Sequence, residues 1–151
     1  MQLDETDEKL LTLLAENARA PVATLARKMG LARTTVQARI ERLEMSGAIT
    51  GYTLRRAHGA NAPLRATVLI SIEPRAGPAV LARLKSLPRV EQVNTTSGRW
   101  DLIAILRART TEELDEVLDD IGAAKGVKSS ESLIHLSTKI DRGYAARAAL
   151  S

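Results

Sequence analysis

The chain has 151 residues, of which 44% are hydrophobic and 26% are charged. This length holds one ordinary domain or two small ones, and the composition is typical of a soluble globular protein. The absence of cysteine and the presence of only two histidines exclude a cysteine-bound zinc site, and we expect no metal and no cofactor. We find neither an apolar stretch that would cross a bilayer nor the features of a secretory signal, so we expect a cytoplasmic protein.

The charge is distributed unevenly along the chain. The net charge is only +4, but residues 1–16 contain five acids and one lysine. Residues 17–60 contain eight Lys or Arg and two acids, a balance of +6 (8 − 2). Such a basic segment is typical of a phosphate-binding surface, although a solvated helical face would carry the same charges.

Three helical patterns follow one another in the first third of the chain, over residues 4–17, 21–29 and 33–45. The first has acids in its first turn, where the helix dipole favours them. The second begins at Pro21, a suitable first helical residue, and is ended by Gly30 in a left-handed cap. Two short helices joined by a glycine turn predict a helix-turn-helix.

The third helix has the features of a recognition helix, which enters the major groove of DNA. Val36, Ile40 and Leu43 have the spacing of an inward face, and the other side carries small or hydrogen-bonding residues. Gln can read adenine, Thr can donate or accept, and Arg can reach guanine or phosphate. A plain three-helix bundle with a polar face is the alternative. We predict that these residues contact DNA: Arg33, Thr34, Thr35, Gln37, Ala38, Arg39 and Arg42.

The segment after the third helix connects two parts of the chain. Residues 49–54 predict a short extended strand of a winged motif, beside which Arg55 and Arg56 would touch phosphate. Residues 57–63 are small and include Gly and Pro, as in a linker, and we expect His58 to be an ordinary linker residue. The predicted organisation is a helix-turn-helix domain at 1–53, a linker at 54–65, a second domain at 66–140 and a tail at 141–151.

The second half of the chain alternates strands and helices. Its expected elements are a strand at 66–73, a helix at 78–87, strands at 90–96 and 100–107, a helix at 110–124 and a strand at 127–140. The order βαββαβ predicts an α+β ferredoxin-like sandwich with two helices on one face of a four-stranded sheet. The other face is left uncovered, so we expect a homodimer. An RNA-recognition domain of the same fold would stack bases on sheet aromatics, which this chain lacks.

Some inward-facing positions of this domain can also be predicted. In the first of its helices, Val80, Leu81 and Leu84 have the spacing of a buried face. In the last strand, either Ile134 and Leu136 or the alternate residues Leu133 and His135 face the helices. We favour Ile134 and Leu136, because both are apolar.

Five segments give the chain a resemblance to the Lrp/AsnC, or feast/famine, family of transcriptional regulators over nearly its full length. Each segment is weak alone, but their order and spacing are specific. They are residues 3–7 (LDETD), 25–31 (LARKMGL), 36–44 (VQARIERLE), 49–52 (ITGY) and 96–101 (TSGRWD).

The resemblance implies a DNA-binding regulator that dimerises through its C-terminal domain, assembles further to tetramers or octamers, and responds to an amino acid or related metabolite. It implies an effector site between subunits, where Gly98 and the backbone of its turn would hold a carboxylate and Asp101 an ammonium. Trp100 lies in the same turn, and the final strand of a neighbouring subunit, including His135, would complete the pocket.

Arg99 departs from the family pattern, which has an acid at this position. A cation beside the pocket would suit a more acidic effector than a neutral amino acid. Alternatively, Arg99 faces solvent or a partner acid, Asp101 is a structural cap and Trp100 packs at an oligomer interface.

Two other functions remain compatible with the architecture. Certain haem-pathway decarboxylases share it, and an enzyme of that kind would need a basic pocket with a histidine, for which Arg99 and His135 are the only hints. The second alternative is a metabolite-binding assembly module without DNA binding. The basic third helix favours the regulator, which is not an enzyme.

Overall fold

The computed structural model describes residues 2–56 and 61–142, so His58 and residues 143–151 of the predicted tail lie outside it. The described chain forms two compact units. Residues 2–56 with 139–142 form the N-terminal unit, and residues 61–138 form the C-terminal unit. No helix in the described part is long and apolar enough to span a membrane.

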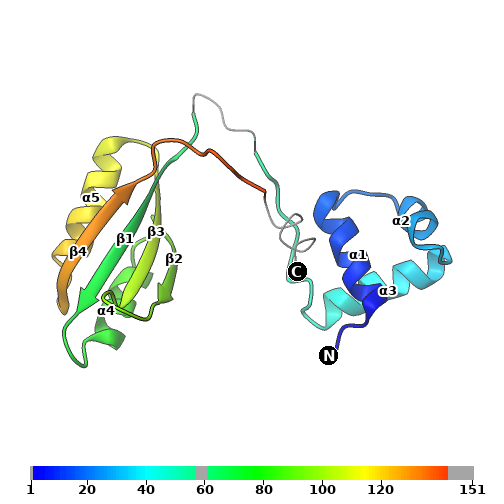
Figure 1. Cartoon of the computed structure of the whole chain (residues 1–151), viewed down its shortest axis with the longest axis horizontal. Helices are drawn as coiled ribbons and strands as arrows, with labels where there is room; N and C mark the ends of the chain where they lie inside the picture. The colour runs from blue at the N-terminus through cyan, green and yellow to red at the C-terminus, as the bar shows by residue number, and fades with distance from the viewer. Residues whose placement is uncertain (1, 57–60, 143–151) are drawn as a thin grey trace. The chain divides into compact units, whose positions relative to one another are not determined.

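The N-terminal unit consists of α1 (Glu5–Glu16), α2 (Val22–Met29) and α3 (Arg33–Met45) (Figure 1). A capping box starts α1, because the Asp4 side chain accepts from the backbone of Asp7 and the Asp7 side chain accepts from the backbone of Asp4. Pro21 is the N-cap of α2 rather than its first residue. The apolar spacing predicted for α3 is confirmed. The three helices pack around a buried core of Leu10, Leu14, Leu25, Ala26, Val36 and Leu43.

The predicted wing is wrong, because the described residues between α3 and the first strand of the C-terminal unit form no strand. Tyr52 is 52% exposed and Leu54 is 85% exposed, so neither side chain is buried by the described residues. Without a packed face or a neighbouring strand, alternation alone does not create a strand.

The C-terminal unit is the predicted βαββαβ sandwich. Its elements are β1 (Leu64–Ile72), α4 (Gly77–Lys85), β2 (Val90–Thr95), β3 (Leu102–Ala108), α5 (Thr111–Gly122) and β4 (Val127–Ile134). The strands form one antiparallel sheet in the order β2-β3-β1-β4 (Figure 1). The alternate β1 residues Ala66, Val68 and Ile70 are buried against α4 and α5, so both helices cover the same face.

Three predictions for this unit need correction. Leu81 was expected to face inward but is 42% exposed. Val80 and Leu84 are the residues of α4 that are buried completely. Strand β3 begins at Leu102, so Trp100 and Asp101 belong to the preceding loop. Strand β4 ends at Ile134 rather than at residue 140, so Leu136 lies beyond it and is 94% exposed, whereas Ile134 pairs with the buried Ala66 and faces the helices as predicted, although it is 50% exposed.

Candidate nucleic-acid interface and effector loop

The turn between α2 and α3 sets up the recognition helix. Gly30 has φ +66°, and its N–H donates to the carbonyls of Ala26 and Arg27 at the end of α2. The N–H of Leu31 also donates to the carbonyl of Ala26, at 3.0 Å. A residue with a side chain is strained in this left-handed conformation, so glycine lets the chain reverse and start α3 three residues later.

Five of the predicted DNA contacts lie together on the exposed start of α3. They are Arg33, Thr34, Thr35, Gln37 and Ala38. Val36, in the middle of this run, is fully buried and anchors the first turn to the core. The exposed side chains at the start of α3 therefore take no part in the core, as is required of a helix that enters a groove.

The N-termini of α2 and α3 lack the side-chain cap that α1 has. Neither Pro21 nor Ala32 offers a capping oxygen, and neither helix has an acid in its first turn. The first N–H groups of these helices therefore keep their positive partial charge, which favours a phosphate. The capped and acidic N-terminus of α1 has the opposite character.

Glu41 belongs to the same exposed surface, although it was not among the predicted DNA contacts. The Gln37 side-chain amide donates to a Glu41 carboxylate oxygen at 3.1 Å. This bond leaves the Gln37 carbonyl as an acceptor, which would suit the amino group of adenine or cytosine. The i, i+4 spacing of a glutamine and an acid is the signal that would have identified the pair.

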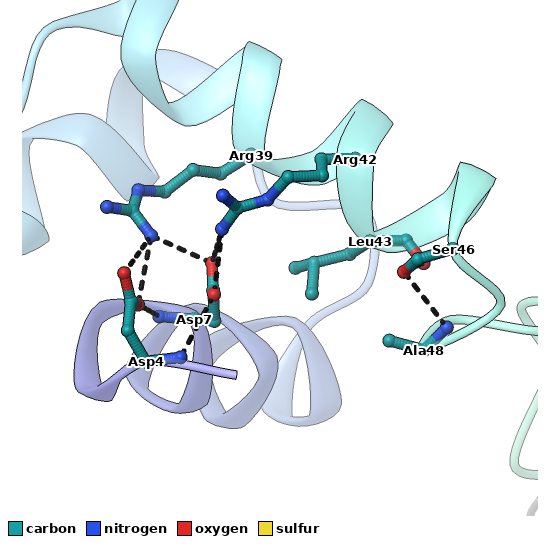
Figure 2. Close-up of polar contacts among 7 residues, drawn as sticks. All are labelled: Asp4, Asp7, Arg39, Arg42, Leu43, Ser46 and Ala48. Atoms are coloured by element: carbon teal, nitrogen blue, oxygen red, sulfur yellow. Dashed lines mark hydrogen bonds and ion pairs between the residues drawn. The ribbon is translucent and has the colours of Figure 1, made fainter. Parts of the chain in front are cut away.

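Arg39 and Arg42 point from α3 towards α1 (Figure 2). The Arg39 Nη1 donates to both oxygens of Asp4, at 2.9 and 2.8 Å, and to Asp7 at 2.9 Å. The Arg42 Nη2 donates to both oxygens of Asp7, at 2.9 and 2.8 Å. We call these four residues the acid–arginine cluster. The hydrogen bond from Arg39, followed by that from the Asp7 backbone, lowers the pKa of Asp4.

The loop that carries the predicted effector residues is tied to the end of β1. The Asp101 N–H donates to the Ile70 carbonyl at 2.9 Å, and the Asp101 Oδ2 accepts from the Ile72 N–H at 2.9 Å. The Thr96 hydroxyl closes the loop by donating to the Trp100 carbonyl at 2.7 Å. Asp101 therefore has the structural role considered as an alternative, and its Oδ1 has no bonded partner among the described residues.

Gly98 and Arg99 form the tip of this loop. Gly98 has φ +99°, and a Cβ placed there would meet nothing within 4 Å, so the tip is open. The Arg99 guanidinium lies 5.4 Å from the centre of the Trp100 ring, a cation–π distance.

His135 is not brought to this loop within one chain. Its Nε2 lies 2.8 Å from the Thr67 hydroxyl, and β4 ends beside Ala66, near the start of β1. The loop is tied to Ile70, four residues further along β1, which corresponds to roughly 13 Å. The structure thus brings together Gly98, Arg99, Trp100 and Asp101 but leaves His135 near the other end of the sheet.

The exposed recognition helix and the ferredoxin-like unit define a two-part helix-turn-helix DNA-binding protein. Residues 3–44 match the AsnC-type helix-turn-helix domain, and residues 65–144 match the Lrp/AsnC ligand-binding domain. The chain therefore belongs to the Lrp/AsnC family of transcriptional regulators, as its sequence motifs predicted.

Individual relatives agree with this assignment. An HTH-type transcriptional regulator of Pyrococcus horikoshii is 34% identical over 90% of this chain and 94% of its own. The regulator LysM of Saccharolobus solfataricus is 29% identical over 90% and 95%. Among solved structures, AsnC of E. coli has a TM-score of 0.84 at 26% identity, over 96% of this chain and 99% of that one. The feast or famine regulatory protein of M. tuberculosis, solved with L-methionine, has a TM-score of 0.81 at 30% identity, over 95% and 99%. These relatives are regulators, which confirms the non-enzymatic prediction.

The substitution Asp4→Asn tests the acid–arginine cluster through its pH dependence. Asparagine is an equally good N-cap, so the change removes chiefly the charge that pairs with Arg39. Because the folded pKa of Asp4 is lowered, its stabilisation is complete above the ordinary aspartate pKa and is lost as pH falls through the folded value. We expect a lower urea midpoint for the variant from about pH 7 to about pH 5, and a shrinking difference below about pH 4.

The matched control is Glu5→Gln, which removes another first-turn acid of α1 for which the described residues offer no arginine partner. It should change the midpoint much less than Asp4→Asn does. A difference between wild type and Asp4→Asn that persists unchanged to about pH 3 would contradict the role of the ion pair.

Proposed function

We propose that this regulator reads duplex DNA through Arg33, Thr34, Thr35, Gln37 and Ala38. The exposure of all five at the uncapped start of α3 is the observation that carries the proposal. The two threonines and Ala38 are short enough for close approach to base edges, while Arg33 and Gln37 reach further. Basic residues near the end of α2, Arg27 and Lys28, would add phosphate contacts.

Binding of the full chain should be measured on the DNA upstream of its own gene and on a random duplex of equal length, as a function of salt. We expect the logarithm of the affinity to fall linearly with the logarithm of salt for both duplexes, with tighter binding to the upstream DNA. Gln37→Ala should reduce that preference by roughly tenfold, because a well-placed base contact contributes ~1–3 kcal/mol of discrimination.

Met45→Ala is the control, since Met45 is 90% exposed at the far end of α3 and should leave both affinities unchanged. Equal affinity for the two duplexes at every salt concentration, with and without amino acids, would contradict sequence-specific reading.

We also propose that two copies pack through the sheet face that the helices leave open. The register places Leu69 of β1, Ile103 and Ile105 of β3 and Leu133 of β4 on this face. Leu133 is 49% exposed, and polar residues such as Gln92, Asn94 and Glu131 surround the apolar centre. A central apolar patch with a polar rim is the arrangement of a two-fold interface, and further assembly to tetramers or octamers would build on that dimer.

Ile103→Glu should convert the dimer to a monomer, because it places one charge from each copy in a desolvated interface. Analytical ultracentrifugation over a range of concentrations gives the mass directly. Leu81→Glu makes a comparable change on the exposed side of α4 and should leave the dimer intact. A dimer that survives Ile103→Glu at low micromolar concentration would place the interface elsewhere.

The effector proposed for the C-terminal unit is an amino acid. Two similar structures contain L-methionine, one at 30% identity and one at 24%. In this chain, Gly98 gives the loop an open tip whose backbone would receive the ligand carboxylate, and the Asp101 Oδ1 would accept from its ammonium. Arg99 adds a cation beside that position, and His135 would have to come from a second subunit.

Isothermal titration of wild type and Arg99→Asp with L-methionine, L-lysine and L-glutamate tests the role of Arg99. If its guanidinium faces the pocket, the variant should lose at least about tenfold in affinity for L-glutamate relative to L-methionine, because a charged hydrogen bond contributes ~1.5–3 kcal/mol. Arg99→Gln separates loss of the cation from gain of an acid. An identical ligand profile for all three proteins would mean that Arg99 packs on Trp100 and faces away from the pocket.

A further inference from the structure

Asp7 is the one charged residue that is buried in the described part of the chain, at 1% exposure. Its carboxylate accepts from the Asp4 N–H at 3.2 Å, from Arg39 at 2.9 Å and from Arg42 at 2.9 and 2.8 Å. A buried carboxylate is tolerated only when it is paired in this way. The two aspartates and the two arginines balance, so the acid–arginine cluster has no net charge.

The cluster matters because α3 has few other attachments. The helix buries only Val36 and Leu43 completely, and its N-cap makes no side-chain hydrogen bond. Val36, Leu43 and the partly buried Ile40 therefore supply the apolar packing of α3, and the ion pairs of Arg39 and Arg42 add two polar attachments along the same helix.

The directions of the side chains separate two sides of α3. Arg39 follows the buried Val36 by three residues, which places it about 60° around the helix and beside α1. Ala38 lies about 160° from Val36, on the far side. Arg42 is intermediate, at about 120°, but its guanidinium turns to Asp7 (Figure 2).

We infer that Asp7 is a positioning residue that recruits Arg39 and Arg42 to hold the recognition helix, and that these two arginines do not neutralise DNA phosphates. This rests on the proposed DNA-binding function and changes the assignment of two residues that the sequence pattern placed at the DNA. Phosphate contacts then fall to basic side chains of the N-terminal unit for which the described residues offer no ion pair, among them Arg19, Arg27, Lys28, Arg33, Arg55 and Arg56.

The test is the salt dependence of binding by the full chain to a random duplex and to the duplex upstream of its own gene. Each phosphate contact adds about 0.9 to the slope of log affinity against log salt. Arg27→Gln should lower the slope by about 0.9 and leave the melting temperature unchanged. Arg39→Gln and Arg42→Gln should lower the melting temperature and leave the slope of the folded protein unchanged.

Variants that release the two arginines from their acids should change the salt slope in the opposite direction, which loss of packing alone would not produce. In Asp4→Asn/Asp7→Asn both guanidinium groups lose their acids and become available to phosphate. We expect the slope to steepen by up to about 1.8, with tighter binding to random DNA and a reduced preference for the upstream duplex. If circular dichroism shows that the double variant is unfolded, Asp7→Asn alone, which removes the acid paired with Arg42 and leaves Arg39 paired with Asp4, should steepen the slope by up to about 0.9.

The inference is overturned if Arg39→Gln and Arg42→Gln each lower the slope by about 0.9 without a change in melting temperature, as Arg27→Gln does, or if a folded variant with released arginines keeps the wild-type slope. Failure of the proposed function looks different. In that case the wild type itself shows no salt-dependent binding to either duplex.

Discussion

A carboxylate removed from water needs partners, and Asp7 has two of them on α3, the proposed recognition helix. This pairing joins the first turn of α1 to the middle of α3, 32 to 35 residues apart in the chain. It holds the side of α3 that carries Arg39 and Arg42 against α1, which leaves Thr34, Thr35 and Ala38 exposed for the proposed base contacts. The acidic start of the chain and its basic segment are thus parts of one cluster. Their charges partly cancel, so fewer cations are free for DNA than the composition suggests.

The C-terminal unit has a comparable constraint, which is the need to cover the apolar residues on both faces of its sheet. Two helices cover one face of its sheet, with Val80, Leu84, Leu114, Val117 and Ile121 packed on β1 and β3. The opposite face has apolar residues at its centre, and the described residues of this unit do not cover them. The proposed second copy would cover this face and would bring two recognition helices into one particle. A regulator with that symmetry gains affinity from two linked contacts without improving either one.

Local rules predicted the elements well because the relevant signals lie within a few residues. The spacing of Val36, Ile40 and Leu43, the glycine at position 30 and the βαββαβ order all depend on short-range geometry. The roles of Arg39 and Arg42 depend on acids more than 30 residues away, which a charge count cannot pair. The same limitation explains why the predicted strand of the wing does not form. Tyr52 and Leu54 alternate like a strand, but only a partner segment makes a strand of them.

The position of the loop at residues 98–101, the proposed effector site, limits how a ligand there can act on DNA binding. The loop is joined to the end of β1 through Asp101, and β1 carries Leu69 on the open face of the sheet. A ligand at this loop therefore acts first on the sheet and on what packs against it, and α3 belongs to the other compact unit. It changes DNA affinity only to the extent that it binds one assembly more tightly than another. By the reciprocity of linkage, DNA that selects the same assembly must tighten binding of the effector by the same factor.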